Sequence, residues 1–309
     1  MTKEQLRIVF MGTPEFAVPS LEILVNAGLN IVGVITAPDK PKGRGQEIAT
    51  SAVKEYGIKA GLKILQPTNL KDPGFLNDLK QLNANLQVVV AFRMLPESVW
   101  DMPSLGTFNL HASMLPQYRG AAPINWVVMN GEKQTGVTTF FLKHKIDTGN
   151  IIFQQNELIS HDDTAGTLYE RLMKKGAQLV LDTTKAIEEG DIQPIAQNDT
   201  LEIKEAPKIF TPTCEINWQQ NSENVYNFIR GLSPYPGAWT KWDDKRTIKI
   251  FKSQLMKIDD NDSLPGERKS DNKSYLRIKT GNGWLDLEEV QLQGKKRMHI
   301  DEFLRGNKI

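Results

Sequence analysis

Apolar residues in the first half of the chain follow two alternating patterns. Short apolar runs, typical of buried strands, occupy Leu6–Phe10, Asn30–Thr36, Leu86–Ala91, Gly106–Leu110 and Gly136–Leu142. Stretches with helical spacing lie between these runs, around Ser20–Ala27, Ser51–Ala60 and Pro123–Asn130. Strands that alternate with helices favour a mostly parallel sheet covered on both faces, which is a Rossmann-like α/β fold.

A long helix is predicted to close this half. Residues 164–189 place apolar side chains at helical intervals, and Gly190 then ends the helix; these side chains are Leu168, Leu172, Leu179, Val180 and Ile187. The acidic pair Asp162–Asp163 suits the positive end of a helix. From Ile192 to Pro212 the pattern is irregular and contains three prolines, so we expect a linker from about residue 191. We therefore expect a first domain over residues 1–206 and a second over residues 207–309.

The second half is predicted to be a smaller all-β domain. Alternating runs at Thr247–Phe251, Ser274–Lys279 and Gly283–Glu289 are broken by clusters of Gly, Pro and Asp. The segment Lys257–Asn272 is polar and charged, and we expect it to be a mobile excursion.

Length and composition agree with a soluble enzyme of two domains. At 309 residues the chain exceeds the usual size of one domain. The start, Met1–Arg7, has no long apolar segment behind a basic leader, so we expect neither a signal peptide nor a membrane span. The single cysteine, Cys214, excludes an intrachain disulfide and fits a reducing cytoplasm. No His lies near Cys214 in the sequence, which favours a buried structural thiol over a nucleophile. We also expect a monomer.

Charge is distributed unevenly along the chain. The net charge is only +1, but from Pro207 onward 18 lysines and arginines face 14 acidic residues. A mildly basic second half could meet an RNA backbone, because cations displace the counterions of phosphates. An ordinary solvated surface accounts for the same imbalance.

Three residues carry the candidate chemistry. Asn109 and His111 lie two positions apart at the end of a predicted strand, so their side chains leave the same face. In open α/β sheets this end of a strand is where ligands bind. An amide and a protonated imidazole can donate hydrogen bonds to the oxyanion of a carbonyl under attack. Asp147 could orient that imidazole or accept a proton through a water. Asn and His at a strand end, and an Asp that starts a turn, also have plain structural explanations.

A family resemblance strengthens the catalytic interpretation. The chain resembles the folate-dependent formyltransferases in Asn109–His111, Ser113–Pro116, Arg119–Pro123 and Asp147–Gly149. Further matching segments cover nearly the whole chain: Phe10–Pro19, Pro38–Gly45, Phe228–Gly237, Gly294–Met298 and Phe303–Gly306. The resemblance implies an oligonucleotide-binding-like (OB-like) barrel for the second domain.

The resemblance also implies substrates and a mechanism. It implies transfer of the formyl group of 10-formyltetrahydrofolate to the free amino group of methionine on initiator tRNA. Asn109 and His111 would stabilise the oxyanion, and Asp147 would position His111. The folate would lie against Ser113, Met114, Leu115 and Pro116, with Val88–Ala91, Phe92 and Met94 on its apolar side.

The segment Pro38–Gly45 carries Lys40, Lys42 and Arg44 on a frame of Pro and Gly. By itself it is typical of a solvated turn. The resemblance implies that it enters the acceptor end of the tRNA, where Arg44 would probe the first base pair with its planar fork of donors.

Two departures from the family pattern concern the edges of the site. Phe92-Arg93-Met94 stands where many relatives have a Tyr-Gly pair, so Arg93 could rearrange the edge of the folate pocket. Lys143–Ile146 lacks the glycine that relatives often carry before Asp147, which leaves that turn without a residue free to take positive φ.

Other classes find less support in the sequence. Gly12-Thr13-Pro14 lacks the Gly-x-Gly-x-x-Gly spacing of a nicotinamide dehydrogenase, and no Walker sequence is present. The four histidines are scattered without cysteine partners, so we expect no metal. Two alternatives stay open: a formyltransferase for a small amine, such as an amino-sugar nucleotide or glycinamide ribonucleotide, and a catalytically idle RNA-binding protein.

Overall fold

The structure is a computed structural model that describes residues 5–42, 47–198, 200, 202–258, 260 and 262–309. The described residues group into two compact units. The first comprises Met1–Arg119, Gly136–Glu157 and Glu170–Glu205, and the second comprises Gly120–Thr135, Leu158–Tyr169 and Ala206–Ile309.

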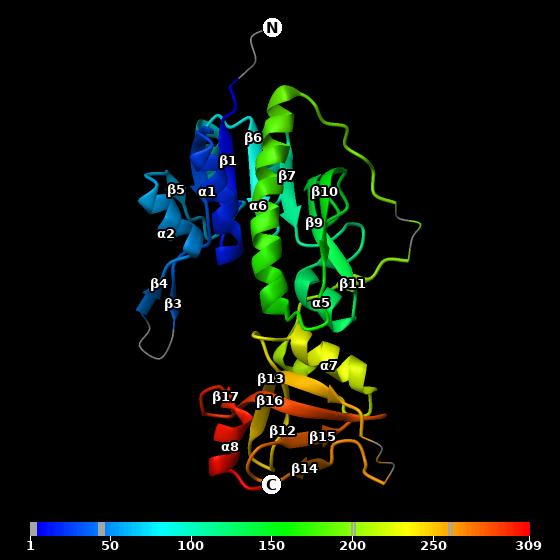
Figure 1. Ribbon diagram of the computed structural model, residues 1–309. Helices are drawn as coiled ribbons and strands as arrows, with labels where there is room; N and C mark the ends of the chain where they lie inside the picture. The colour runs from blue at the N-terminus through cyan, green and yellow to red at the C-terminus, as the bar shows by residue number, and fades with distance from the viewer. Residues whose placement is uncertain (1–4, 43–46, 199, 201, 259, 261) are drawn as a thin grey trace. The chain divides into compact units, whose positions relative to one another are not determined.

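A mixed sheet forms the centre of the first unit (Figure 1). Its strands lie in the order β10-β9-β7-β6-β1-β2-β5, and all neighbouring pairs from β7 to β5 are parallel. Strand β9 runs antiparallel to β7. The strands are β1 (Ile8–Gly12), β2 (Ile31–Ile35), β5 (Ile64–Leu65), β6 (Leu86–Val90), β7 (Thr107–His111), β9 (Gln134–Phe141) and β10 (Ile151–Leu158). The mostly parallel α/β fold is thereby confirmed.

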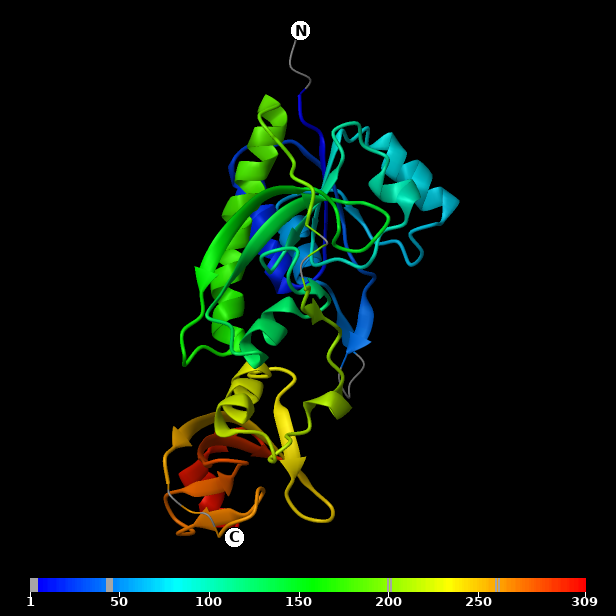
Figure 2. The same ribbon diagram turned by 90° about the vertical axis from the view of Figure 1, so that its right-hand side faces the viewer.

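Helices cover both faces of this sheet. Helix α6 (Ala165–Glu189) runs along one face (Figures 1 and 2). There Gly176 meets the side chain of Leu110, and Thr183 bonds to Thr139. On the other face, α3 (Pro73–Gln81) and α4 (Glu97–Trp100) share a core with Val9, Met11 and Val89. The remaining helical elements of this unit are η1 (Glu15–Ala17), α1 (Val18–Asn26) and α2 (Ala52–Lys59).

Most predicted elements of the first half form within two residues of their expected bounds. The long helix ends at Gly190, which takes a φ of 73°, and its predicted apolar residues are buried. Helix α3 was not predicted, although Asp72 caps it by accepting from the Phe75 amide and Pro73 stands at its first turn.

An antiparallel sheet forms the second unit, in the strand order β12-β13-β16-β15-β14, with β17 paired to β16. These strands are β12 (Ala238–Lys241), β13 (Thr247–Met256), β14 (Arg268–Ser270), β15 (Leu276–Lys279), β16 (Trp284–Leu292) and β17 (Met298–His299). Alternate residues such as Ile248, Ile250, Leu285 and Leu287 make its core. The predicted smaller all-β domain is thereby confirmed, and the structure shows that its sheet is antiparallel.

Helices α5 (Pro123–Met129), α7 (Ser222–Gly231) and α8 (Ile300–Gly306) complete the second unit. Helix α7 was not predicted, although Asn221 caps its first turn and Val225, Ile229 and Leu232 pack into the core. Arg230 of α7 is buried and donates to the carbonyls of Asp163 and Ser160. Burial lowers the pKa of the Arg230 guanidinium.

Two irregular segments contain more structure than the pattern predicted. Within Lys257–Asn272, Arg268–Ser270 forms β14 and pairs with β15. Within Ile192–Pro212, Ile195 pairs with Ile151, and β11 (Glu205–Ala206) pairs with β8 (Arg119–Gly120). A short turn, η2 (Thr211–Cys214), buries Cys214, so the expected buried thiol is confirmed, and burial raises the pKa of that thiol.

Candidate active site

Strand β7 places Asn109 and His111 on the face of the sheet opposite α6. Leu110 points to α6, so the residues on either side of it point away from that helix. Asn109 lies level with Val89 of β6 and Phe140 of β9. Within the described part of the chain the half-buried Asn109 amide makes no hydrogen bond, which leaves its donors available to a substrate.

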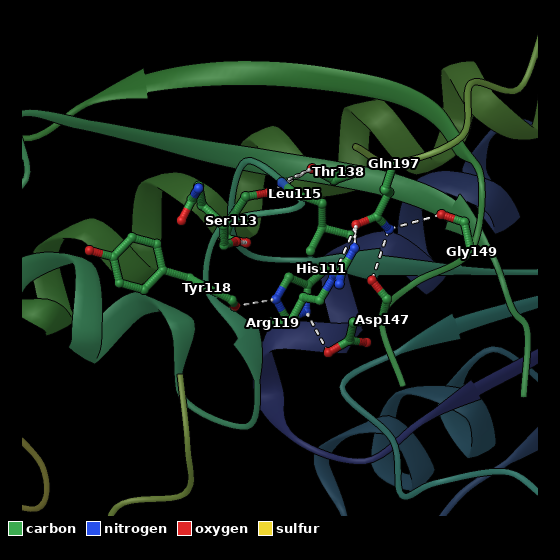
Figure 3. A network of polar contacts seen from close by, with 10 residues as sticks. His111, Ser113, Leu115, Tyr118, Arg119, Thr138, Asp147, Gly149 and Gln197 are labelled. Carbon is green, nitrogen blue, oxygen red and sulfur yellow. Dashed lines mark hydrogen bonds and ion pairs between the residues drawn. The ribbon is translucent and has the colours of Figure 1, made fainter. Parts of the chain in front are cut away.

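Both ring nitrogens of His111 face oxygen atoms (Figure 3). Nε2 lies 2.9 Å from the carbonyl oxygen of Tyr118, and Nδ1 lies 3.9 Å from Oδ2 of Asp147. The imidazole is 7% exposed and the carboxylate 14%. Because a carbonyl only accepts, Nε2 must carry a hydrogen, and Nδ1 is the nitrogen on the carboxylate side. The predicted pair of His111 and Asp147 is brought together by the fold.

This arrangement suits the stabilisation of negative charge on an oxygen. The Tyr118 carbonyl accepts from Nε2 of the imidazole, and the Asp147 carboxylate lies on the Nδ1 side of the ring. The side chains of Asn109 and His111 extend from the same face of β7. The Asn109 amide and a hydrogen on Nδ1 of His111 could both donate to an oxyanion on that side.

The turn that carries Asp147 has a conformation that the sequence analysis did not predict. Asp147 itself takes a φ of 54°, so the expectation that this turn has no residue with positive φ is wrong. Asp tolerates the left-handed region better than most residues. Gly149 lies so close to β9 that a Cβ there would stand 1.5 Å from the carbonyl oxygen of Phe141. The glycine of the turn is thus required at 149 for space.

A residue outside every predicted motif also joins the site. The side-chain amide of Gln197 donates to the carbonyls of Asp147 and Gly149 and accepts from Arg119 (Figure 3). Gln197 lies in the segment expected to be a linker, where no periodicity marked it.

The predicted folate segment follows β7 directly, and its four residues differ in exposure. Ser113 and Leu115 are buried, whereas Met114 and Pro116 are partly exposed. The Ser113 hydroxyl donates to the Gln117 carbonyl, so it shapes the loop. Thr138, directly opposite His111, donates to the Ser113 carbonyl and accepts from the Leu115 amide. Hydrogen bonds to β9 therefore fix the course of this segment.

A surface pocket of about 630 Å³ lies next to the apolar residues expected to meet the folate. Its lining comes from two segments, Thr68–Lys71 and Arg93–Ser98. Arg93 lines it and donates to the carbonyls of Pro67 and Thr68. Met94, at 76% exposure, is open to solvent.

The described part of the basic segment expected to meet RNA belongs to a hairpin of two strands in the first unit. Strand β3 (Lys40–Lys42) pairs antiparallel with β4 (Glu47–Ala49), and Lys40 is exposed. Lys42 belongs to the paired backbone, and Arg44 lies outside the described residues. Asp39 anchors the base of this hairpin by accepting from Lys54 and Gln66, and these hydrogen bonds lower its pKa.

Two kinds of feature are absent from the ranges that the structure describes, a metal site and a membrane-spanning helix. The described residues contain no group of three or more His, Cys, Asp or Glu side chains that could hold a metal ion. Over those ranges no helix has the length and apolar character needed to span a bilayer.

Known proteins match this chain over its full length. Residues 6–184 match the family described as "Formyl transferase", and residues 208–308 match "Formyl transferase, C-terminal domain". The chain is 53% identical to a methionyl-tRNA formyltransferase of Parabacteroides distasonis, with 100% of this chain and 98% of that protein covered. It is 52% identical to a methionyl-tRNA formyltransferase of Flavobacterium johnsoniae, over 98% of this chain and 96% of the other.

Solved structures share the fold at low identity. WlaRD, a sugar 3N-formyl transferase, aligns with a TM-score of 0.67 at 21% identity, over 95% of this chain and 100% of that one. HypX from Aquifex aeolicus in complex with tetrahydrofolic acid aligns with a TM-score of 0.65 at 17% identity. This chain is covered to 97% in that alignment but spans only 47% of HypX.

Proposed function

The chain belongs to the formyl transferase family, and from this membership we propose that it transfers the formyl group of 10-formyltetrahydrofolate to the amino group of methionyl initiator tRNA. The product is N-formylmethionyl-tRNA, which starts translation. One observation carries the proposal. Relatives named methionyl-tRNA formyltransferase are 52–53% identical to this chain, over 98–100% of its length. The second unit is included in that identity.

The likeness to the sugar formyl transferase does not favour a small amine as the acceptor. At 21% identity it reports the shared fold alone. Asn109, His111 and Asp147 would serve either acceptor equally, since both reactions attack the same formyl carbon. An idle RNA-binding protein would have no need of the paired imidazole and carboxylate.

In the proposed reaction the lone pair of the methionine amine attacks the formyl carbon. The C=O bond opens to an oxyanion, which the Asn109 amide and the Nδ1 hydrogen of His111 stabilise by donating to it. When the C=O bond reforms, the bond from carbon to N10 of the folate breaks. The proton lost by the amine passes to N10, and Asp147 can relay it through a water. The products are a formamide and tetrahydrofolate, with no net proton released.

His111 needs a fixed orientation for this role. The Tyr118 carbonyl holds the Nε2 hydrogen, so Nδ1 is the nitrogen left to face the reacting atoms. The carboxylate of Asp147 lies on that side, 3.9 Å from Nδ1. We assign oxyanion stabilisation to Asn109 and His111 and positioning of His111 to Asp147.

We assign the folate to the segment after β7. Ser113, Met114, Leu115 and Pro116 would line its site, with the Ser113 hydroxyl shaping the loop and the partly exposed Met114 and Pro116 able to touch the ligand. Support comes from the hydrogen bonds that attach this segment to β9 beside His111. No metal has a part in this chemistry.

We assign the tRNA to two regions of the chain. Residues 1–206 would form the catalytic domain, whose basic segment with Lys40, Lys42 and Arg44 would meet the acceptor end. Residues 207–309 would form an OB-like tRNA-binding domain.

Support for the second region is its excess of lysine and arginine, together with a surface where cations and aromatic rings adjoin. Lys208 lies over the ring of Phe210, and both are exposed. Trp239 donates to the carbonyl of Thr211, and Lys241 follows two positions along on the same face of β12. Cations beside stacking surfaces suit an RNA chain.

We further propose that the protein acts in the cytoplasm as a monomer. Its acceptor, a charged tRNA, is a cytoplasmic molecule, and every group assigned above belongs to one chain. Size-exclusion chromatography with light scattering would give the mass of the particle, and a dimer would contradict this part.

A formylation assay tests the function. Purified protein is mixed with 10-formyltetrahydrofolate and either initiator or elongator methionyl-tRNA, and formylmethionine is measured after deacylation. We expect formylation of the initiator and little of the elongator. An amino-sugar nucleotide serves as the competing acceptor. Formyl transfer to that amine alone would support the small-amine alternative, and tRNA binding without transfer to any acceptor would support an idle protein.

A further inference from the structure

The Gln197 side chain makes hydrogen bonds in every direction that an amide allows. Its Oε1 accepts from Arg119 Nε at 3.1 Å and from Arg119 Nη2 at 2.6 Å. Its Nε2 donates to the carbonyls of Asp147 and Gly149, both at 2.8 Å. An amide has two donor hydrogens and two acceptor directions, and all are engaged here (Figure 3). Such a side chain is held in a single orientation.

The partners of Gln197 belong to the two segments that hold His111. Asp147 lies opposite Nδ1 of the imidazole, and Arg119 directly follows Tyr118, whose carbonyl accepts from Nε2. Gln197 therefore ties the turn on one side of the ring to the loop on the other. A change at Gln197 would alter the separation between imidazole and carboxylate without removing either group.

The turn at Asp147 depends on such support. Its φ of 54° lies in the left-handed region, which non-glycine residues adopt only when their surroundings hold them there. The Gln197 amide bonds the carbonyls of Asp147 and Gly149 at once. Gln197 is itself placed by the backbone, because Ile195 exchanges hydrogen bonds of 2.8 Å with Ile151 at the start of β10.

We propose that Gln197 is a positioning residue for formyl transfer, which acts by holding the Asp147 carboxylate against His111. This inference rests on the proposed function, since it concerns the rate of that reaction. It also means that the segment after α6 is part of the catalytic unit as well as a connection. Catalysis is sensitive to such placement, because a displacement of about 1 Å can cost a hundredfold in rate.

Gln117 provides a matched control for a substitution at Gln197. Its side chain also joins this segment to the loop after β7, by donating to the carbonyl of Glu202 and accepting from the Lys204 amide. Gln117→Ala thus removes equivalent hydrogen bonds between the same segments without a bond to the Asp147 turn.

We expect Gln197→Ala to lower kcat by roughly ten- to a hundredfold, with KM for both substrates within about twofold of the parent. Gln117→Ala should keep kcat within about twofold. Gln197→Glu distinguishes the hydrogen bonds to Arg119 from those to the Asp147 turn, because a carboxylate can accept from Arg119 but cannot donate to the turn. It should lose as much activity as Gln197→Ala. A Gln197→Ala enzyme with parental kcat would overturn the proposal.

A double-mutant cycle distinguishes positioning from general weakening of the fold. If Gln197 acts through Asp147, then adding Gln197→Ala to the Asp147→Asn variant should lower the rate of formyl transfer by less than about twofold. The rate is measured in single turnover with excess enzyme. If the role of Gln197 were merely structural, Gln197→Ala would lower the rate by the same factor in the parent and in Asp147→Asn, and that result would refute the assignment.

Hydrogen exchange adds a readout that does not need activity. Amides of residues 143–150 should exchange faster in Gln197→Ala than in the parent, and at the parental rate in Gln117→Ala. Unchanged exchange in Gln197→Ala would contradict the proposal that Gln197 holds the Asp147 turn. If the parent formylates no acceptor, the proposed function fails, while exchange still decides whether Gln197 holds the turn.

Discussion

At the scale of single residues, the site depends on one imidazole that is held at both nitrogens. The Tyr118 carbonyl fixes the hydrogen on Nε2, and the Asp147 carboxylate stands on the Nδ1 side. His111 is buried, so few orientations are open to its ring. A donor fixed before the substrate arrives needs no rearrangement when the oxyanion forms, which is the main advantage of such sites.

Removal of either member of this pair should therefore slow turnover with little effect on folding. We expect His111→Ala and Asp147→Asn each to lower kcat by on the order of a hundredfold or more. Binding of initiator tRNA should stay within about twofold, because neither side chain belongs to the basic surfaces. Steady-state kinetics, with circular dichroism and a tRNA-binding assay as controls, would check this. A variant that turned over at the parental rate would remove that residue from the mechanism.

The sequence could predict some of these residues and not others. Strand periodicity alone puts Asn109 and His111 on one face, because their separation of two residues needs only a strand. Asp147 is distant in the sequence, so strand periodicity could not place it beside His111; its carboxylate made it a candidate partner, and the family resemblance favoured that role. Gln197 sits in an irregular segment and acts through tertiary hydrogen bonds, so no local pattern could indicate it. The positive φ of Asp147 likewise comes from its surroundings.

At the scale of elements, strong periodicity was the reliable guide. The long helix α6 and the buried strands β2 and β6 formed where the pattern placed them. Helix α7 was missed among polar residues, although its cap at Asn221 and its apolar spacing of Val225, Ile229 and Leu232 would have indicated it. Short strands such as β8 and β11 are made by pairing with distant segments, which no local window contains.

The turn between β9 and β10 should not accept a side chain at Gly149. A Cβ there would stand 1.5 Å from the Phe141 carbonyl oxygen, so the backbone of β9 or of the turn must move. We expect Gly149→Ala to destabilise the protein by about 1–3 kcal/mol and to lower kcat further by displacing Asp147. Thermal denaturation and kinetics would measure both effects.

Gly306→Ala is the control for this substitution, because a Cβ at Gly306 meets no heavy atom within 4 Å. It should leave both quantities near the parental values. A fully active and stable Gly149→Ala protein would contradict the close approach.

The hairpin of β3 and β4 should depend on Asp39 for its direction. Asp39 accepts hydrogen bonds from Lys54 and Gln66, and these bonds lower its pKa from the ordinary 3.8. A lowered pKa means that the ionised anchor is present above the ordinary value and is lost only as pH falls through the lowered one. The anchor therefore stays intact throughout the neutral range.

Asp39→Asn removes this anchor at neutral pH. We expect it to raise KM for initiator tRNA by several-fold while KM for the folate changes little, because the hairpin is assigned to the tRNA. Asp78→Asn, an exposed carboxylate on α3, is the control and should change neither constant. If Asp39→Asn changed KM for the tRNA and KM for the folate equally, Asp39 would support the fold in general.

At the scale of the whole molecule, the chain has two units with different sheets, and the proposed function assigns catalysis to one and most of the tRNA contact to the other. The mostly parallel unit contains the paired His111 and Asp147, as well as the hairpin. The antiparallel unit has its own core, and residues 207–309 within it carry 18 lysines and arginines against 14 acidic residues. Fold class followed from the alternation of patterns, whereas the acceptor followed only from identity with named relatives.

This division predicts different salt responses for the two substrates. A protein that displaces counterions from RNA loses affinity with a slope of about −0.9 per phosphate contact on a double-logarithmic plot. We therefore expect kcat/KM for initiator tRNA to fall steeply with salt, and kcat/KM for the folate to fall far less. Lys208→Gln and Lys241→Gln, on the surface with Phe210 and Trp239, should each reduce the tRNA slope by about one unit. Lys185→Gln, on α6, should leave the slope unchanged. If all three variants kept the parental slope, the antiparallel unit would have to contact tRNA through another surface.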